Sequence, residues 1–165
     1  MTLDSELVEL AAQVVAQNQQ SGRQVTTAES CTGGLVAAAI TEIAGASNIL
    51  QRAFVTYSND AKSQMLGVPE AILQAHGAVS TQTAEAMARG ALNSSSADVA
   101  VAISGIAGPD GGSAEKPVGT VAFARATAAG TSVQLVSEMR YFDPNLSRSE
   151  IRRLAAGVAL RLLLP

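Results

Sequence analysis

Apolar residues recur every three or four positions at both ends of the chain, which is the spacing of an amphipathic helix. Near the N-terminus the pattern predicts a helix that begins at Asp4 or Ser5 and ends near Ser21 and Gly22. Near the C-terminus it predicts a helix over about 147–163, in which arginines alternate with leucine and alanine. Both helices should pack an apolar face against a sheet.

Between these helices, short β-rich apolar runs predict strands, and longer periodic runs predict further helices. The predicted strands cover 24–29, 53–57, 98–104, 119–127 and 131–142, with Gly130 near the turn of a final hairpin. The predicted helices cover 33–45 with Gly45 as the C-terminal stop, a segment capped by Asn59 or Asp60, 69–76 and 80–95. Strands that alternate with helices and end in a hairpin predict an α/β fold, a three-layer α/β/α sandwich with a mixed β-sheet.

Composition narrows the class of protein. With 47% hydrophobic but only 3% aromatic residues, the core must consist of Ala, Val, Ile and Leu. A net charge of -3 and the lack of any run of Lys and Arg argue against a nucleic-acid partner. The apolar runs are shorter than the roughly 20 residues that span a bilayer, and the N-terminus lacks the features of a secretion signal. We expect a cytoplasmic protein that acts on neither membranes nor nucleic acids.

No internal repeat, linker or low-complexity segment divides the sequence, so residues 1–165 should form a single domain. The chain contains one cysteine, Cys31, which excludes an internal disulfide and a metal site of the cysteine-cluster type.

The stretch TTAESCTGG at 26–34 lies on a predicted strand-to-helix turn. Ser30, Cys31 and Thr32 precede Gly33 and Gly34, which open the helix, so free backbone N–H groups there could hold an oxyanion or a phosphate. The alternative is that Ser30 or Thr32 only caps the helix and that the glycines allow close packing.

If Ser30 is a nucleophile, another residue must take its proton. Cys31 is itself a candidate nucleophile at a helix N-terminus, but it has no identifiable base and could be a buried structural thiol. The one histidine, His76, lies near a predicted helix end and is better explained as a helix-terminal or loop residue. A carboxylate, a lysine or a tyrosine therefore remains as the base.

The segment TYSNDAK supplies both Tyr57 and Lys62 at a strand-to-helix junction. Lys62 and Lys116 are the only lysines, and arginine cannot serve as a base. Burial would lower the pKa of Lys62 because desolvation disfavours its charged form. The alternative is an ordinary solvated lysine, although a cation in the first turn opposes the helix dipole.

The loop GIAGPDGGSAEKPVGT at 105–120 joins two predicted strands and could present consecutive N–H groups to an anion. It matches neither the P-loop nor the dinucleotide-binding fingerprint, and it could be only a long turn. Lys116 within it is placed to meet a substrate anion.

Four motifs in this order are characteristic: TTAESCTGG at 26–34, FVTYSNDAK at 54–62, HGAVS at 76–80 and ISGIAGPDGGSAEKPVGTV at 103–121. Over essentially its whole length the chain resembles the CinA C-terminal-domain family, most closely the single-domain amidohydrolases. The resemblance implies hydrolysis of the carboxamide of nicotinamide mononucleotide to nicotinate mononucleotide and ammonia, in pyridine-nucleotide salvage. It implies no metal and no organic cofactor.

The resemblance also implies site residues. Ser30 would attack the carboxamide, Lys62 would act as the base, and Tyr57 would assist proton transfer or orient Lys62. The rest of the site follows from the residues themselves. The N–H groups around Cys31, Thr32, Gly33 and Gly34 would stabilise the oxyanion. The candidate contacts to the ribose and phosphate of the substrate are Ser104, Gly105, Gly108, Asp110, Gly111, Gly112 and Lys116.

Two other functions stay open at this point. The chain could be a non-catalytic nucleotide-binding or regulatory module, because the family takes its name from competence and damage induction. It could also be an amidase that acts on a related amide. The likeness to the family further leads us to expect a homodimer or larger homo-oligomer.

Overall fold

A computed structural model describes residues 3–165 of the protein, and every structural statement below refers to that range. The helical segments are α1 (Ser5–Ser21), α2 (Leu35–Thr41), the short 3₁₀ turn η1 (Ala46–Asn48), α3 (Asn59–Leu66), α4 (Glu70–His76), α5 (Thr81–Asn93) and α6 (Arg148–Leu162). The strands are β1 (Val25–Glu29), β2 (Leu50–Val55), β3 (Val99–Gly105), β4 (Thr120–Ala129) and β5 (Ser132–Tyr141). Within the described range, no helix combines the length and apolar character that crossing a bilayer requires.

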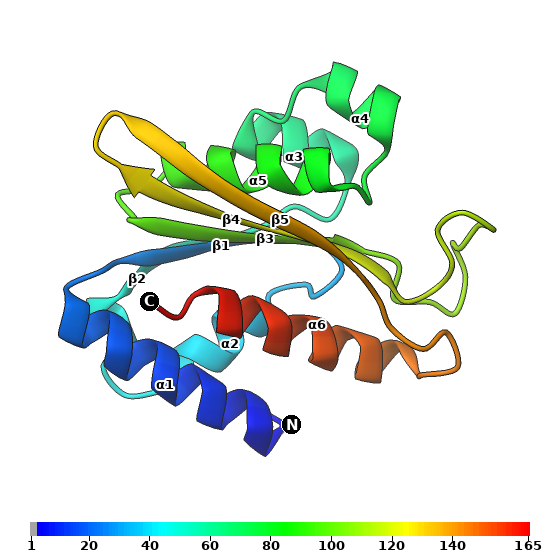
Figure 1. Ribbon diagram of the computed structural model, residues 1–165. Helices are drawn as coiled ribbons and strands as arrows, with labels where there is room; N and C mark the ends of the chain where they lie inside the picture. Colours follow the sequence, from blue (N-terminus) through cyan, green and yellow to red (C-terminus); the bar gives the residue numbers. More distant parts are fainter. Residues whose placement is uncertain (1–2) are drawn as a thin grey trace.

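The strands form one mixed sheet in the order β2-β1-β3-β4-β5. The pairs of β1 with β2 and with β3 are parallel, whereas β4 runs antiparallel to both β3 and β5. Helices α1, α2 and α6 cover one face of the sheet, and α3, α4 and α5 cover the other (Figure 1). The predicted three-layer α/β/α sandwich is therefore confirmed.

The two faces of the sheet carry different side chains, because residues alternate between faces along each strand. On β3, Val99, Val101 and Ile103 face the core under α1, α2 and α6. The intervening Ala100 and Ala102 belong to the second core, where most of the sheet residues and much of α5 are alanine. Small side chains on both sides let α5 approach the sheet closely.

Close packing also fixes α3, the helix that contains Lys62. Gly90 of α5 lies against the end of α3, and a Cβ atom at Gly90 would overlap the carbonyl oxygen of Leu66. A side chain at this position would push the two helices apart. The position of Lys62 thus depends on a glycine in a neighbouring helix.

Most predicted elements agree with the structure to within one or two residues, and two predictions are wrong. The helix predicted over 33–45 ends at Thr41, and Gly45 precedes the 3₁₀ turn η1 instead of ending α2. The strand predicted over 53–57 is β2, which begins and ends earlier. As an edge strand β2 exposes most of its side chains, so its first residues lack the apolar pattern of a buried strand.

A smaller correction concerns the start of α3. The N-cap of α3 is Ser58 and not the predicted Asn59 or Asp60. The side chain of Ser58 accepts a hydrogen bond from the backbone N–H of Ala61.

Candidate active site

Ser30 is the first residue after β1, at the edge of the sheet where the carboxyl ends of three parallel strands meet. Its backbone N–H donates to Ile103 O of β3 at 2.9 Å, which ties the serine to the centre of the sheet. Its side chain is largely buried. In open α/β sheets this edge is where ligands bind.

The turn after Ser30 is tight because Gly33 and Gly34 have positive φ angles of 61° and 93°, a region that other residues rarely adopt. The N–H of Gly33 donates back to Ser30 O at 3.0 Å. No other residue within 3–165 accepts a hydrogen bond from the N–H of Cys31 or Thr32. These two groups are therefore the N–H donors of the turn that no other described residue engages.

Glu29 occupies the N-terminal end of α2. Its carboxylate is fully buried and accepts hydrogen bonds from the N–H groups of Gly34, Val36 and Ala37 at 3.0, 3.1 and 2.9 Å. A negative charge at a helix N-terminus is stabilised by the helix dipole. The sequence suggested that free N–H groups at the N-terminus of α2 could bind a ligand, but in the structure the carboxylate of Glu29 accepts hydrogen bonds from three of them.

Lys62 lies in the first turn of α3 and is among the largest fully buried side chains, 1% exposed. Its Nζ donates to Ser30 Oγ at 3.1 Å and to the carbonyl of Thr56 at 3.0 Å. Burial lowers the pKa of the Lys62 ammonium group. The alternative of an ordinary solvated lysine is therefore wrong, and the nucleophile candidate has a basic partner within hydrogen-bonding distance.

The two other groups considered as reagents are placed differently. Burial raises the pKa of the Cys31 thiol to about 11, so the thiol stays protonated and is a weak nucleophile at neutral pH. His76 is the exposed last residue of α4 and makes no side-chain hydrogen bond to Ser30 or Lys62.

Tyr57 and Arg148 meet at the mouth of the site. The side chain of Tyr57 is 61% exposed, and its hydroxyl accepts a hydrogen bond from Arg148 Nη2 at 2.7 Å. The other terminal nitrogen of Arg148 donates to the carbonyl of Gly108 at 2.7 Å. Tyr57 thus contacts Arg148, whereas the hydrogen bonds of Lys62 go to Ser30 and Thr56.

Sequence reasoning did not find Arg148. It is the first residue of α6, 91 positions beyond Tyr57, and only the fold brings the two side chains together. The one available signal was an arginine directly after a helix cap, a position where a cation opposes the helix dipole.

A pocket of about 190 Å³ opens at these residues. Of the predicted site residues, six line it: Ser30, Cys31, Tyr57, Lys62, Ser104 and Gly105. Arg148 and Asn59 contribute polar groups to the same lining, and Ala78, Val79 and Ala107 contribute apolar ones. The pocket therefore combines a buried Ser–Lys pair, an apolar wall and an arginine at its mouth.

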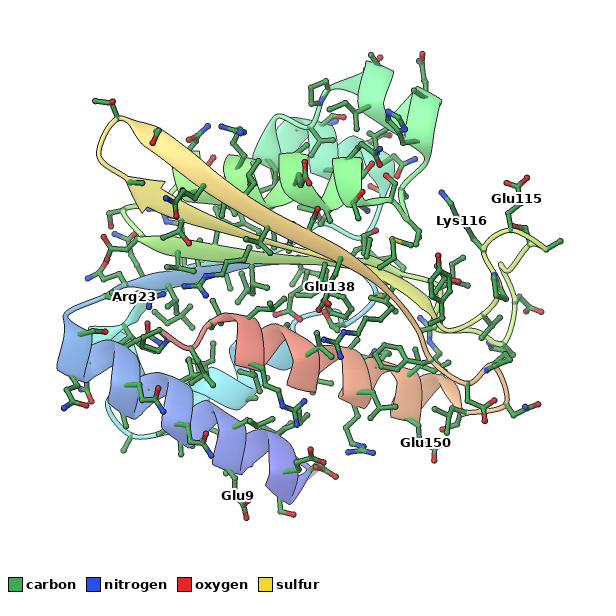
Figure 2. All side chains as sticks on the ribbon, in the orientation of Figure 1. Glu9, Arg23, Glu115, Lys116, Glu138 and Glu150 are labelled. Atoms are coloured by element: carbon green, nitrogen blue, oxygen red, sulfur yellow. The ribbon has the colours of Figure 1, made fainter. Side chains whose placement is uncertain are left out.

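The remaining predicted residues of the glycine loop lie outside this pocket. Asp110, Gly111 and Gly112 are exposed, while Gly108 contacts Arg148 through its carbonyl. Figure 2 shows Lys116 beside Glu115 on the outer part of the loop. Its Nζ donates to the carbonyl of His76 at 2.9 Å, next to a second cavity that lies beyond Val79.

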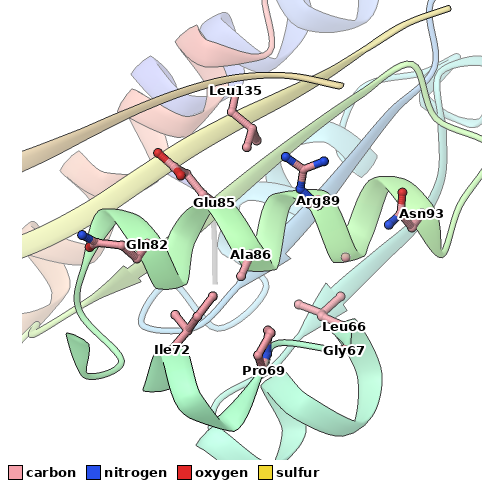
Figure 3. A pocket seen from close by; sticks show the side chains of 11 residues that line it. Leu66, Gly67, Pro69, Ile72, Gln82, Glu85, Ala86, Arg89, Asn93 and Leu135 are labelled. Carbon is pink, nitrogen blue, oxygen red and sulfur yellow. The ribbon is translucent and has the colours of Figure 1, made fainter. Parts of the chain in front are cut away.

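A separate cavity of about 360 Å³ lies between α5 and the link from α3 to α4 (Figure 3) and shares no lining residue with the pocket of the Ser–Lys pair. It contains none of the predicted site residues. Within residues 3–165, no group of three or more His, Cys, Asp or Glu side chains is arranged to hold a metal ion.

The chain belongs to the CinA C-terminal domain family, which matches residues 7–165. This assignment agrees with the resemblance that the four motifs indicate. The match extends over both the Ser–Lys pair and α6 with Arg148.

Individual relatives support the same assignment. The chain is 54% identical over 160 residues to the nicotinamide-nucleotide amidohydrolase PncC of Escherichia coli strain K12, which covers 97% of this chain and 94% of that protein. It is 50% identical to a longer CinA-like protein of Shewanella denitrificans, where the match covers 93% of this chain and 35% of that protein. The solved structure of the competence/damage inducible protein CihA from Agrobacterium tumefaciens superposes with a TM-score of 0.90 at 51% identity, covering 99% of this chain and 97% of that one.

Proposed function

We propose that this protein is a nicotinamide-nucleotide amidohydrolase, which hydrolyses the carboxamide of nicotinamide mononucleotide to nicotinate mononucleotide and ammonia. The name of the Escherichia coli relative, 54% identical over nearly the whole chain, supports the reaction. The observation that carries the chemistry is the 3.1 Å hydrogen bond between Lys62 Nζ and Ser30 Oγ in a pocket.

The first half of the reaction forms an acyl-enzyme. Neutral Lys62 takes the proton of Ser30 as Oγ attacks the carboxamide carbon. The carbonyl oxygen becomes an oxyanion, and we assign its stabilisation to the N–H groups of Cys31 and Thr32, which donate to no other residue within 3–165. Lys62 then returns its proton to the amide nitrogen, the C–N bond breaks, and ammonia leaves.

The second half releases nicotinate mononucleotide. Water enters the position that ammonia left, and Lys62 takes one of its protons as the water oxygen attacks the ester carbon. Collapse of this second tetrahedral intermediate breaks the bond to Ser30 Oγ, and Lys62 returns the proton to the serine. The enzyme ends as it began, with Lys62 neutral and Ser30 protonated.

The shape of the pocket suggests how the nucleotide binds. The pyridine ring fits against Ala78, Val79 and Ala107, which brings the carboxamide to Ser30. A pocket of about 190 Å³ leaves the ribose and phosphate at its mouth, where the guanidinium of Arg148 can bind phosphate oxygens in pairs. Ser104 and Gly105 line the same pocket and are our candidates for ribose contacts. Roles for Gly108, Asp110, Gly111 and Gly112 stay predictions, and we assign the phosphate to Arg148 in preference to Lys116.

Ammonia release from purified protein and nicotinamide mononucleotide tests the proposal. Wild type should turn over, while Ser30→Ala and Lys62→Met should each lose nearly all activity and stay folded by circular dichroism. Full activity in either variant would rule out the Ser–Lys mechanism. Nucleotide binding by wild type without ammonia release would favour the non-catalytic module instead.

A substrate panel separates the proposal from an amidase for a related amide. The nucleotide should react with a higher kcat/KM than its riboside, and the riboside with a higher kcat/KM than free nicotinamide. A preference for an amide without phosphate would contradict the assigned substrate.

Two further predictions belong to this proposal, a cytoplasmic location and a homo-oligomer. β5 is an edge strand with exposed Val136 and Tyr141, the kind of edge that can pair with a second copy. Light scattering after size-exclusion chromatography would report the mass in solution.

A further inference from the structure

The turn that carries Ser30 is held from outside the pocket by a residue of the last helix. Arg152 of α6 is half-buried and donates from Nε to the carbonyl of Cys31 at 3.1 Å and from Nη2 to the carbonyl of Thr32 at 2.8 Å. These bonds join positions about 120 residues apart in the sequence. They are the only hydrogen bonds of the Arg152 side chain within the described range.

The bonds to the carbonyls also determine where the free N–H groups point. A peptide unit is planar and trans, so the carbonyl of one residue and the N–H of the next point in opposite directions. Because Arg152 holds the carbonyl of Cys31, it fixes the direction of the Thr32 N–H. The N–H of Cys31 is fixed in the same way, because Gly33 donates to the carbonyl of Ser30.

Without these contacts the turn would have other conformations available. Gly33 and Gly34 both lie in the left-handed region, and glycine moves between regions more easily than other residues. The carboxylate of Glu29 holds the N–H of Gly34 on the far side of the turn. The turn is therefore held by two side chains. Glu29 accepts a hydrogen bond from one of its N–H groups, and Arg152 donates hydrogen bonds to two of its carbonyls.

We infer that Arg152 and Glu29 are positioning residues of the reaction, which act by aiming the N–H groups of Cys31 and Thr32 at the developing oxyanion. This inference rests on the proposed role of Ser30 as the nucleophile. Neither side chain lines the pocket of Ser30, so neither is assigned a contact with the substrate. Their variants should change the rate of bond formation at Ser30 far more than the binding of the nucleotide.

Arg152→Ala tests the role of the guanidinium, and Arg153→Ala is its matched control. Arg153 is the next residue of the same helix and pairs with Asp4, the N-cap of α1, and with Glu6 of α1. Arg152→Ala should lower kcat about 30- to 100-fold with KM within about 3-fold, a loss somewhat below that for removing an oxyanion donor outright. Arg153→Ala should leave both constants within about 2-fold.

Reaction of Ser30 with a fluorophosphonate provides a readout that needs no nicotinamide substrate. Ser30 Oγ forms a bond to phosphorus, the P–F bond breaks to release fluoride, Lys62 takes the serine proton, and the phosphoryl oxygen occupies the oxyanion position. The labelling rate should fall by about the same factor as kcat in Arg152→Ala. If wild type labels at Ser30 but does not hydrolyse the nucleotide, the proposed function fails while the positioning role remains under test.

Chemical rescue distinguishes positioning from a general loss of stability. A cavity of about 200 Å³ between α1 and α6 reaches Arg152, so added guanidinium ion can enter the space that the side chain leaves. Guanidinium below denaturing concentrations should raise the labelling rate of Arg152→Ala at least about 5-fold. The same concentration of sodium chloride, or guanidinium added to Arg153→Ala, should have no such effect.

Glu29→Gln tests the other edge of the turn, with Glu150→Gln as its control. Glu150 also caps a helix with its carboxylate, at the start of α6, but it does not contact the turn. Glu29→Gln should lower the labelling rate about 10-fold or more, and Glu150→Gln should leave it unchanged.

The inference is overturned if folded Arg152→Ala labels Ser30 at the wild-type rate, or if its slow labelling does not respond to guanidinium. Should Arg152→Ala fail to fold, Arg152→Lys replaces it. Lysine keeps the charge but cannot donate to both carbonyls from one planar group, so its labelling rate should lie below wild type. A wild-type rate in Arg152→Lys would equally overturn the inference.

Discussion

The two lysines of the chain lie in opposite environments. Lys62 is 1% exposed and donates to Ser30 and to the carbonyl of Thr56. Lys116 is partly exposed on the glycine loop and donates to the carbonyl of His76. Both satisfy a backbone carbonyl, but only Lys62 is removed from water and placed beside a hydroxyl group.

This difference explains why one lysine can act as a base and the other holds a loop in place. A buried ammonium loses hydration that a single carbonyl and a hydroxyl cannot fully replace, so the neutral form of Lys62 is favoured. At Lys116, the charge interacts favourably with the C-terminal end of α4. The chemistry thus follows from the environment of each side chain and not from its type.

Replacement of each lysine by methionine should give the largest contrast. Lys62→Met should lower kcat/KM for nicotinamide mononucleotide by about 10³-fold or more, because general acid–base catalysis contributes about 10²- to 10⁴-fold and is used in both half-reactions. Lys116→Met should stay within about 3-fold of wild type. Ammonia release measures both. A fall in kcat/KM for Lys116→Met as large as that for Lys62→Met would contradict the different roles of the two lysines.

Replacing Arg148 should have the next largest effect on activity, because we place Arg148, and not Lys116, at the substrate phosphate. Arg148→Gln should raise KM for the nucleotide about 10- to 100-fold with a smaller change in kcat. The same variant should hardly change kcat/KM for the riboside, which lacks the phosphate. An equal loss with both substrates would contradict a phosphate contact.

Stability should also distinguish the two lysines. Burial lowers the folded-state pKa of Lys62 below its ordinary value of 10.5. Between this lowered pKa and pH 10.5 the unfolded chain binds more protons than the folded one, so the stability of wild type rises with pH. Lys62→Met removes the free-energy cost of burying an ammonium group, so this variant should be more stable than wild type near neutral pH, by about 1–4 kcal/mol. Urea unfolding at several pH values should show this gap shrinking as the pH approaches 10.5.

A stability gap that grows with rising pH would have the wrong sign for a buried lysine. Lys116→Met provides the control for loss of a lysine at a partly exposed position.

Among the substitutions in the pocket lining, Tyr57→Phe should have the smallest effect. The hydroxyl of Tyr57 bonds to Arg148 and not to Lys62, so its loss removes one hydrogen bond at the mouth of the pocket. We expect kcat/KM to fall about 3- to 10-fold, the equivalent of about 0.5–1.5 kcal/mol. A fall as large as that of Lys62→Met would show that Tyr57 takes part in proton transfer.

Much of this architecture could be predicted from the sequence, because the hydrophobic pattern depends on local periodicity. The choice of Lys62 over His76 as the base also followed from counting the residues that could serve as a base, since few can. The edge strand β2 was harder to place, because its exposed first residues carry no apolar signal.

The contacts that shape the site could not be read in the same way. Arg148 contacts Tyr57 at the pocket, 91 positions earlier in the sequence, and Arg152 contacts the turn after Ser30, about 120 positions earlier. No local pattern separates these two residues from the other arginines of α6. Glu29 did offer a local signal, a carboxylate at the end of an apolar strand just before a helix. That signal would have shown that the N-terminus of α2 already has an internal anion.

The central claim is that Lys62 is neutral when Ser30 reacts, and an NMR titration tests it directly. Protein labelled with ¹³C at the lysine ε-carbon gives only two lysine signals, and Lys62→Met identifies the one from Lys62. We predict that this signal titrates below 10.5, because burial lowers the pKa of Lys62, and that the rate of Ser30 labelling rises with pH along the same curve. A Lys62 signal that titrates at 10.5 or above would contradict the account.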